Sequence, residues 1–256
     1  MPEDHLIYHV ENKVAWFTIN REKQRNAISA EAISLFVKYL DQAEDDDNVR
    51  AICVTGSGDK AFCSGGDLGG GMMDDGTDPI TAYANLIKRL AGFSKPTVAR
   101  VNGYCLAGGT GFMLACDIVV AREDARFGTP EVNVGLFPMM IGAVIFRNVP
   151  RKKAMEMVLL GDRLTARQAL DMGMLTRVVP ADQLDGTVAG ILETLAEKSP
   201  IGLKLGKEAF YRTADLPFEE ALDQLAQGLK KVIATEDAVE GMTAFIEKRK
   251  PVFTGK

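Results

Sequence analysis

The chain has 256 residues, of which 46% are hydrophobic and 25% are charged, as in ordinary globular proteins. Its net charge of -5 argues against a nucleic-acid-binding protein, which would normally present a basic face. No apolar run is long enough to suggest a membrane span, and the acidic start MPEDHLIYHV lacks the apolar core of a signal peptide. We therefore expect one large domain, with or without a small appendage, in the cytoplasm, without nucleic-acid or membrane partners.

The chain's cysteines and histidines argue against two further kinds of site. Cys53, Cys63, Cys105 and Cys116 lie in apolar runs and form no C-x-x-C pair. This pattern predicts reduced, buried thiols and no metal site. The only histidines, His5 and His9, fall in the first predicted strand. A Ser-His-Asp or Cys-His hydrolase needs a histidine beside its nucleophile, so the sequence argues against that class.

Predicted strands and helices alternate along the first 150 residues. In chain order we expect a hairpin over 6–20, a helix over 26–46, a strand over 49–57, a glycine-rich loop over 60–78, a helix over 80–92, a strand over 95–105, a buried helix beginning near 108, a strand over 117–124 and a loop region over 125–142. This alternation predicts crossover connections and an α/β fold.

From about residue 150 the pattern becomes mostly helical. We place a core domain at 1–195 and a helical region at 196–256. The apolar faces of these helices either pack against another subunit or cover the chain's own core.

Two glycine clusters, CSGGD and LAGGTG, each directly follow a predicted strand. Glycine allows backbone to approach a ligand closely, so two such corners could direct their N–H groups at one oxygen atom. The alternative is that both clusters are tight turns needed for close packing. Neither cluster matches a phosphate-binding fingerprint.

Five segments, taken in order, carry a resemblance to a known family. They are AFCSGGDL (61–68), VNGYCLAGGTGFMLACDIVVA (101–121), ARFGTPEVNVGLFP (125–138), LTARQALDMGMLTRVVP (164–180) and EGMTAFIEKRKPVF (240–253). Together they resemble the crotonase, or enoyl-CoA hydratase/isomerase, family. The resemblance implies a spiral of ββα units with a helical trimerisation region, hence a homotrimer or a dimer of trimers. It also implies an acyl-CoA substrate and no cofactor beyond the CoA moiety of that substrate.

The resemblance also assigns residues to roles. The amides of Gly66 and Gly108 would stabilise an enolate at the thioester oxygen, and Glu131 in GTPEVNVG would be the acid/base. The residues expected to bind CoA are Arg25, Ala27, Ser64, Gly65, Asp67, Leu68 and Lys248, the last near the adenosine 3′-phosphate.

One position departs from the pattern of two-glutamate hydratases. Such enzymes have a glutamate three residues after the helix-start glycine, where this chain has Gly111. We interpret Gly111 as emptying space beside the substrate, since a helix already begun gains nothing from glycine. A single glutamate suits proton transfer along an allylic system, so we expect double-bond isomerisation. Hydration with one glutamate, with Asp67 or Tyr104 helping to hold the water, decarboxylation of a malonyl-type CoA, and a non-catalytic acyl-CoA-binding role remain alternatives.

Overall fold

The computed structural model describes residues 4–67, 73 and 76–256. Its main sheet has six strands in the order β1-β2-β3-β5-β7-β10, and β1 is the only one of these that runs antiparallel to its neighbour. The strands are β1 (Leu6–Glu11), β2 (Val14–Ile19), β3 (Ala51–Gly56), β5 (Thr97–Val101), β7 (Ile118–Arg122) and β10 (Arg177–Val179). A smaller sheet has the order β4-β6-β8-β9, formed by β4 (Ala61–Cys63), β6 (Tyr104–Leu106), β8 (Arg126–Gly128) and β9 (Leu164–Thr165).

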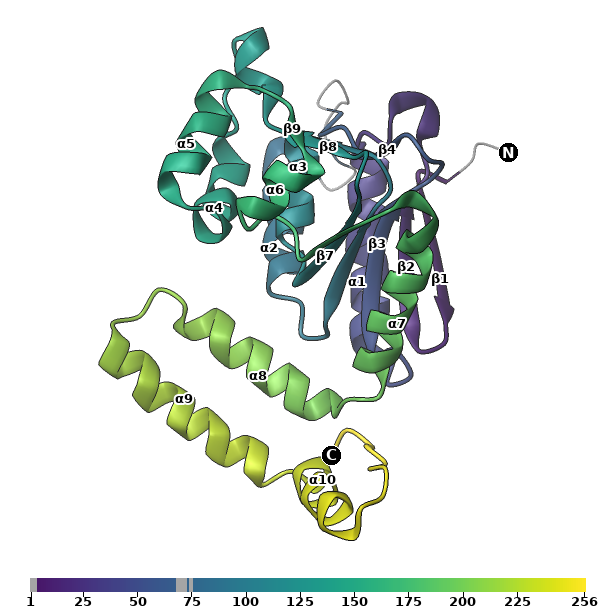
Figure 1. Cartoon of the computed structure of the whole chain (residues 1–256), viewed down its shortest axis with the longest axis vertical. Helices are drawn as coiled ribbons and strands as arrows, with labels where there is room; N and C mark the ends of the chain where they lie inside the picture. The colour runs from purple at the N-terminus through teal and green to yellow at the C-terminus, as the bar shows by residue number, and fades with distance from the viewer. Residues whose placement is uncertain (1–3, 68–72, 74–75) are drawn as a thin grey trace.

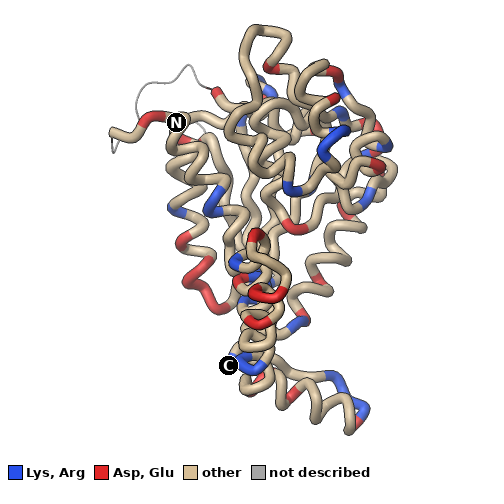
Figure 2. The backbone as a smooth tube through the Cα atoms, turned by 90° about the vertical axis from the view of Figure 1, so that its left-hand side faces the viewer, with Lys and Arg blue, Asp and Glu red and all other residues tan. Residues whose placement is uncertain are grey.

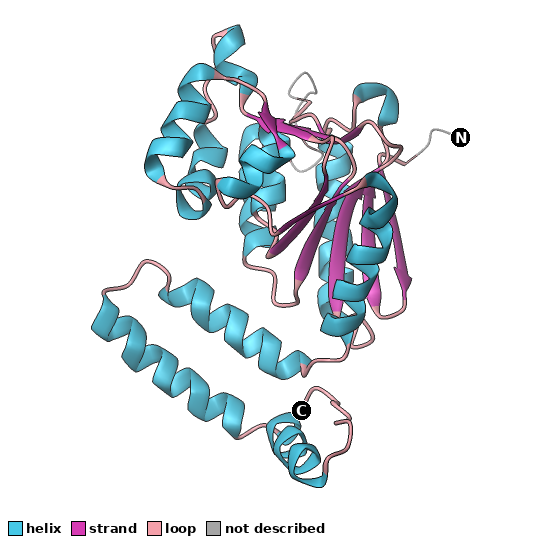
Figure 3. Cartoon of the chain, in the orientation of Figure 1, coloured by secondary structure: helices cyan, strands magenta, loops and turns pink. Residues whose placement is uncertain are grey.

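Helices cover both faces of the main sheet (Figure 3). On one face lie α1 (Ala30–Asp45) and α2 (Pro79–Ala91), and on the other lies α7 (Leu184–Ala196). Because both faces are covered, every residue of β3 is buried. The hairpin and the helices expected before residue 100 are confirmed to within a few residues.

Successive turns of the chain repeat one pattern. β3 leads to β4 and then α2, while β5 leads to β6 and then α3 (Gly108–Leu114). β7 and β8 begin a third turn, so each turn contributes one strand to each sheet (Figure 1). The predicted α/β spiral of ββα units is confirmed.

Three parts of the chain differ from the prediction. The loop expected over 60–78 contains the strand β4. Residues 125–142, expected to form a loop region, contain β8, the 3₁₀ helix η2 (Pro130–Val134) and the start of α4 (Met139–Asn148). The mostly helical part after residue 150 also supplies β9 and β10 to the sheets, among α5 (Arg151–Leu160) and α6 (Ala166–Asp171). Strands of two or three residues are too short for an alternating pattern, which explains why they were not predicted.

The last three long helices stand apart from the sheets (Figure 1). They are α8 (Pro200–Thr213), α9 (Phe218–Ile233) and α10 (Glu236–Glu247). Lys207 of α8 ties them to the core, because its ammonium pairs with Asp117 and donates to the Lys95 carbonyl at 2.9 Å. The helix α7 ends at Ala196, and the division into 1–195 and 196–256 stays a prediction.

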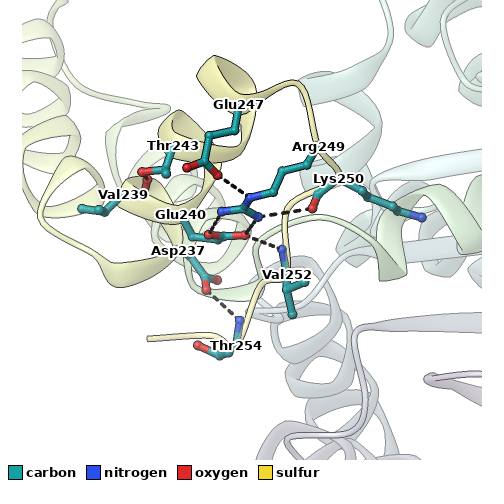
Figure 4. A network of polar contacts seen from close by, with 9 residues as sticks. All are labelled: Asp237, Val239, Glu240, Thr243, Glu247, Arg249, Lys250, Val252 and Thr254. Carbon is teal, nitrogen blue, oxygen red and sulfur yellow. Dashed lines mark hydrogen bonds and ion pairs between the residues drawn. The ribbon is translucent and has the colours of Figure 1, made fainter.

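The C-terminal tail folds back onto α10 (Figure 4). The buried carboxylate of Asp237 accepts hydrogen bonds from the Thr254 amide and the Ser199 hydroxyl, both at 2.7 Å. Arg249 donates to both oxygens of Glu240, at 2.6 and 2.7 Å, and this holds the pKa of Glu240 at about 2. These contacts hold the C-terminal tail against α10, although α8, α9 and α10 stand apart from the sheets.

Charges of both signs are interspersed along the chain (Figure 2). Within the described ranges, no helix is both long and apolar enough to span a bilayer.

Candidate active site

Three predicted site residues follow three neighbouring strands of the smaller sheet. Gly66 comes after β4, Gly108 after β6 and Glu131 after β8. These strands run parallel and pair in the order β4-β6-β8. Since the carboxyl ends of parallel strands meet at one edge of a sheet, the fold brings the three residues together there.

The backbones of the two glycine clusters are in close contact. A Cβ built on Gly108 would lie 3.2 Å from the Gly66 nitrogen, and one built on Gly65 would lie 3.4 Å from the Gly108 nitrogen. The recorded hydrogen bonds between described residues use neither the Gly66 nor the Gly108 N–H as a donor. With no partner among the described residues, both N–H groups could bind an oxygen atom that enters this space.

The 3₁₀ helix η2 holds Glu131 against the core. Gly135 ends η2 in the left-handed conformation, and the Glu131 carbonyl accepts a hydrogen bond from the Leu136 amide at 3.0 Å. Asn133 attaches η2 to α5 through the Gly161 carbonyl at 3.2 Å. The carboxylate predicted to act as acid and base is thus carried on a short, anchored turn.

The carboxylate of Glu131 has an unpaired oxygen. Its Oε2 is buried and has no hydrogen-bond partner within the described part of the chain. Burial raises the pKa of Glu131 above its ordinary value. A half-buried carboxylate with a raised pKa is suited to accept and return a proton.

The interpretation of Gly111 as empty space is wrong. A Cβ built on Gly111 would lie 2.2 Å from Cγ2 of Ile141, which is buried in α4. Glycine is needed there because α3 and α4 pack too closely for a side chain at that position. Position 111 still supplies no carboxylate, but the space there is occupied by the apolar side chain of Ile141.

Two loops bring most of the predicted CoA-binding residues together. The Ser64 amide donates to the Arg25 carbonyl at 3.1 Å, and the Ile28 amide donates to the Gly65 carbonyl at 2.9 Å. Residue Ala27 lies between these contacts. The Asp67 amide donates to the Ile28 carbonyl at 2.8 Å, which continues the pairing. Residues 25–28 therefore lie directly beside residues 64–67.

A basic cavity adjoins the first of these loops. Its volume is about 610 Å³, and it is lined by Asn20, Arg21, Glu22, Lys23, Gln24, Arg25, Ser57 and Lys60. Four of these are Lys or Arg and one is acidic, so the cavity suits an anion such as a phosphate. Of these residues, the family resemblance implies only Arg25.

Asp67 and Tyr104, the two residues considered for holding a water, have other partners. Asp67 accepts a hydrogen bond from the Arg21 guanidinium at 2.9 Å. Tyr104 is exposed and lies under the Arg163 guanidinium, 5.7 Å from the ring centroid. Neither arrangement places a second carboxylate next to Glu131.

One predicted residue is not brought to the site, and another cannot be placed. Lys248 caps the C-terminal end of α10, at the opposite end of the molecule from α3 (Figure 1). Leu68 lies outside the described residues.

Two further side chains lie at the site, and no pattern in the sequence identifies them as site residues. Tyr83 donates a hydrogen bond from its hydroxyl to the Gly108 carbonyl at 2.8 Å, and Ile141 packs against Gly111. Tyr83 is one polar group on an otherwise apolar helix face, a pattern that most often means core packing.

Comparisons with known proteins agree over the whole chain. Residues 9–256 match the family model described as enoyl-CoA hydratase/isomerase. The 2,3-dehydroadipyl-CoA hydratase of Escherichia coli (strain K12) is 34% identical over 253 residues, covering 98% of this chain and 99% of the relative. The short-chain-enoyl-CoA hydratase of Clostridium acetobutylicum is 33% identical over 255 residues, covering 98% and 97%. A crystal structure of an enoyl-CoA hydratase from Mycobacterium smegmatis superimposes with a TM-score of 0.92 at 30% identity, covering 98% of this chain and 99% of the other.

Proposed function

This chain belongs to the enoyl-CoA hydratase/isomerase family, whose members act on acyl-CoA thioesters, and we propose that it moves the double bond of an enoyl-CoA. The observation that carries this proposal is one carboxylate, that of Glu131, at the same sheet edge as two backbone amides that have no partner among the described residues, with no carboxylate at position 111. Isomerisation needs one group that takes a proton from one carbon and returns it to another.

The proposed reaction begins with a 3-enoyl-CoA. The Glu131 carboxylate removes a proton from C2, and the electron pair moves to the thioester oxygen to give a dienolate. The N–H groups of Gly66 and Gly108 stabilise the negative charge on that oxygen. Glu131, now protonated, returns the proton to C4, and the double bond comes to rest between C2 and C3. The carboxylate is regenerated, so neither charge nor atoms change overall.

Hydration of a 2-enoyl-CoA is the second candidate, favoured by the names of the relatives, which are hydratases. Adding water across a double bond requires a held water and two proton transfers. Position 111 cannot supply the second carboxylate, because Ile141 fills the space beside Gly111, so we propose that Glu131 would have to manage both. The geometry therefore supports isomerisation better.

We propose that the basic cavity receives the phosphates of CoA, while the acyl-thioester reaches the glycine pair. The contacts between residues 25–28 and residues 64–67 make this a continuous path. The proposed chemistry uses only Glu131 and two amides, so we propose no cofactor beyond the CoA moiety of the substrate. Within a single chain, Lys248 lies far from this path. We propose that Lys248 of another copy of the chain approaches the adenosine 3′-phosphate.

We propose that the chain forms a homotrimer or a dimer of trimers through its C-terminal helices. α9 buries none of its residues within one chain, although it is amphipathic. Large apolar side chains on α8–α10 are exposed, among them Phe210, Phe218, Leu222, Leu229, Phe245 and Ile246. Such a surface is expected to be covered in solution. We also propose a cytoplasmic location, since all four cysteines are free and buried.

Ultraviolet absorbance with two substrates tests the function. Isomerisation of trans-3-hexenoyl-CoA creates the absorbance of a conjugated enoyl thioester, whereas hydration of trans-2-hexenoyl-CoA removes it. We expect the first change to be faster, and to fall by about 10²- to 10⁴-fold in Glu131→Gln. Glu123→Gln, at an exposed position after β7, is the matched control and should remain fully active.

Other outcomes would replace the proposal. Faster hydration would establish the second candidate. No change with either substrate, despite measurable CoA binding, would favour a decarboxylase or a non-catalytic acyl-CoA-binding protein.

A further inference from the structure

Tyr83, a buried residue of α2, contacts Gly108, one of the two glycines of the proposed amide pair. Tyr83 is 2% exposed, and its hydroxyl donates a hydrogen bond to the Gly108 carbonyl at 2.8 Å. A Cβ built on Gly108 would lie 3.3 Å from this hydroxyl oxygen and 3.2 Å from the Gly66 nitrogen. The Tyr83 hydroxyl and the Gly66 amide therefore both lie close to Gly108.

The residue before Gly108 shows why this backbone needs to be held. Ala107 has φ 52° and ψ -133°, a conformation that residues with a Cβ rarely adopt. Such a conformation persists only where its surroundings impose it. Because Ala107 contributes the carbonyl of the peptide that carries the Gly108 N–H, its dihedral angles determine where that N–H points.

Contacts on both sides impose the conformation. On one side the Ala107 amide donates to the Gly128 carbonyl at 2.9 Å, and this carbonyl also accepts from the Thr110 hydroxyl at 2.9 Å. On the other side lies the Tyr83 hydroxyl. Among the side chains of the described residues, Tyr83 is the one whose recorded hydrogen bond ends on Gly108 itself.

We infer that Tyr83 is a positioning residue, whose hydroxyl fixes the direction of the Gly108 N–H and thereby sets how strongly the amide pair polarises a thioester. The inference rests on the proposed function of that pair. Tyr83 acts through Gly108 and does not need to touch the substrate. Burial, with smaller contributions from Cys63, Cys105 and Glu131, raises the pKa of Tyr83 well above its ordinary value, so the hydroxyl keeps its proton.

The test removes only the hydroxyl. In Tyr83→Phe we expect kcat for trans-3-hexenoyl-CoA to fall by about ten- to a hundredfold, with KM within about twofold. Tyr39→Phe is the matched control, because Tyr39 stacks on Tyr8 of the N-terminal hairpin and its loss should leave both constants unchanged. If Tyr83 only stabilised the fold, Tyr83→Phe would change the melting temperature but would not lower kcat while leaving KM unchanged.

A spectroscopic measurement reports the polarisation directly. Hexanoyl-CoA labelled with ¹³C at the thioester carbonyl should show a downfield shift of that resonance on binding to the wild type, and a smaller shift on binding to Tyr83→Phe. Equal carbonyl shifts together with equal kcat in the two proteins would overturn the inference. If the wild type itself produces no carbonyl shift, the proposed role of the amide pair fails, and the inference fails with it.

A second variant addresses the restraint without touching Tyr83. Glycine adopts the Ala107 dihedral angles without strain, so Ala107→Gly should fold at least as stably as the wild type. We expect its kcat to fall, because the Gly108 peptide is then held less firmly. Wild-type kcat in Ala107→Gly would show that the restraint has no catalytic effect, and this would also overturn the inference.

Discussion

Ile141 occupies the space that any side chain at Gly111 would need. A Cβ at residue 111 would lie 2.2 Å from Cγ2 and 2.5 Å from Cβ of Ile141. One isoleucine thus accounts for the glycine in the middle of α3, because a larger residue at position 111, glutamate included, would collide with it. In the proposed reaction, packing between α3 and α4 therefore determines that position 111 carries no carboxylate.

Gly111→Ala should destabilise the protein because its methyl group would collide with Ile141. We expect a loss of about 1–3 kcal/mol in the free energy of unfolding, measured by urea denaturation. The matched control is Gly142→Ala in α4, where a Cβ would have no described atom within 4 Å. That change should be neutral or stabilising by up to about 1 kcal/mol, since alanine favours helix. Equal losses for the two variants would contradict the packing account.

A double-mutant cycle identifies the colliding partner. In an Ile141→Ala background, which is itself destabilised, the additional cost of Gly111→Ala should largely disappear. An unchanged cost in that background would mean that another residue excludes the side chain.

The pH dependence of activity should reflect Glu131. Burial raises the pKa of Glu131, and the carboxylate must be deprotonated to take the first proton. We therefore expect kcat/KM for trans-3-hexenoyl-CoA to rise with pH through an apparent pKa above that of a free glutamate. A rise centred at or below the ordinary glutamate value would argue against this residue as the base.

Stability should depend on pH with the sign that a raised carboxyl pKa requires. The folded state binds the Glu131 proton more tightly than the unfolded state, so this contribution is complete below the unfolded-state pKa and is lost as pH rises through the folded-state pKa. Glutamine does not titrate. The melting temperature of Glu131→Gln relative to wild type should therefore increase across this pH window and then level off. A relative decrease over the same window would contradict the raised pKa.

The basic cavity should contribute to CoA affinity but not to the chemical step. Arg25→Ala and Lys60→Ala are each expected to raise the Kd for CoA roughly three- to tenfold, with kcat unchanged, as for a partly exposed charge pair. Arg167→Ala is the control, because that side chain, on α6, is 78% exposed and does not line the cavity. Calorimetry at two salt concentrations measures the effect, which should shrink as salt rises. Wild-type affinity in both cavity variants would place the phosphates elsewhere.

Self-association should depend on the C-terminal helices. Phe245 of α10 is 85% exposed in one chain, so we expect Phe245→Glu to lower the mass in solution to that of a single chain. Ile7→Glu, on β1 and 44% exposed, should leave the assembly intact. Light scattering after size-exclusion chromatography gives the masses. A wild type that is already a single chain would overturn the proposed assembly.

Much of the fold could be predicted because the helices have local signals. The cap of α1 at Ser29 and its buried face at Ile33, Phe36 and Leu40 follow a regular helical pattern. The short strands β8 and β10 have no comparable pattern, and their positions come only from pairing with neighbours. Residues 66, 108 and 131 are also far apart in the sequence, so the sequence alone does not show that they follow adjacent strands.

The site could be predicted only where its residues lie in motifs. Gly66, Gly108 and Glu131 were identified through glycine clusters and the family resemblance, and the structure places them at one sheet edge. Ile141 and Tyr83 act through packing between helices that are distant in sequence, which no local pattern records. The interpretation of Gly111 as empty space was wrong for the same reason.

Hydrogen exchange at C2 of a saturated substrate analogue tests the central claim most directly. Hexanoyl-CoA incubated with the wild type in deuterated buffer should gain deuterium at C2, measured by mass spectrometry, because the amide pair stabilises the enolate and Glu131 moves the proton. Glu131→Gln should retain the fold and exchange about 10²- to 10⁴-fold more slowly. Undiminished exchange in that variant, or none above the enzyme-free rate in the wild type, would contradict the account.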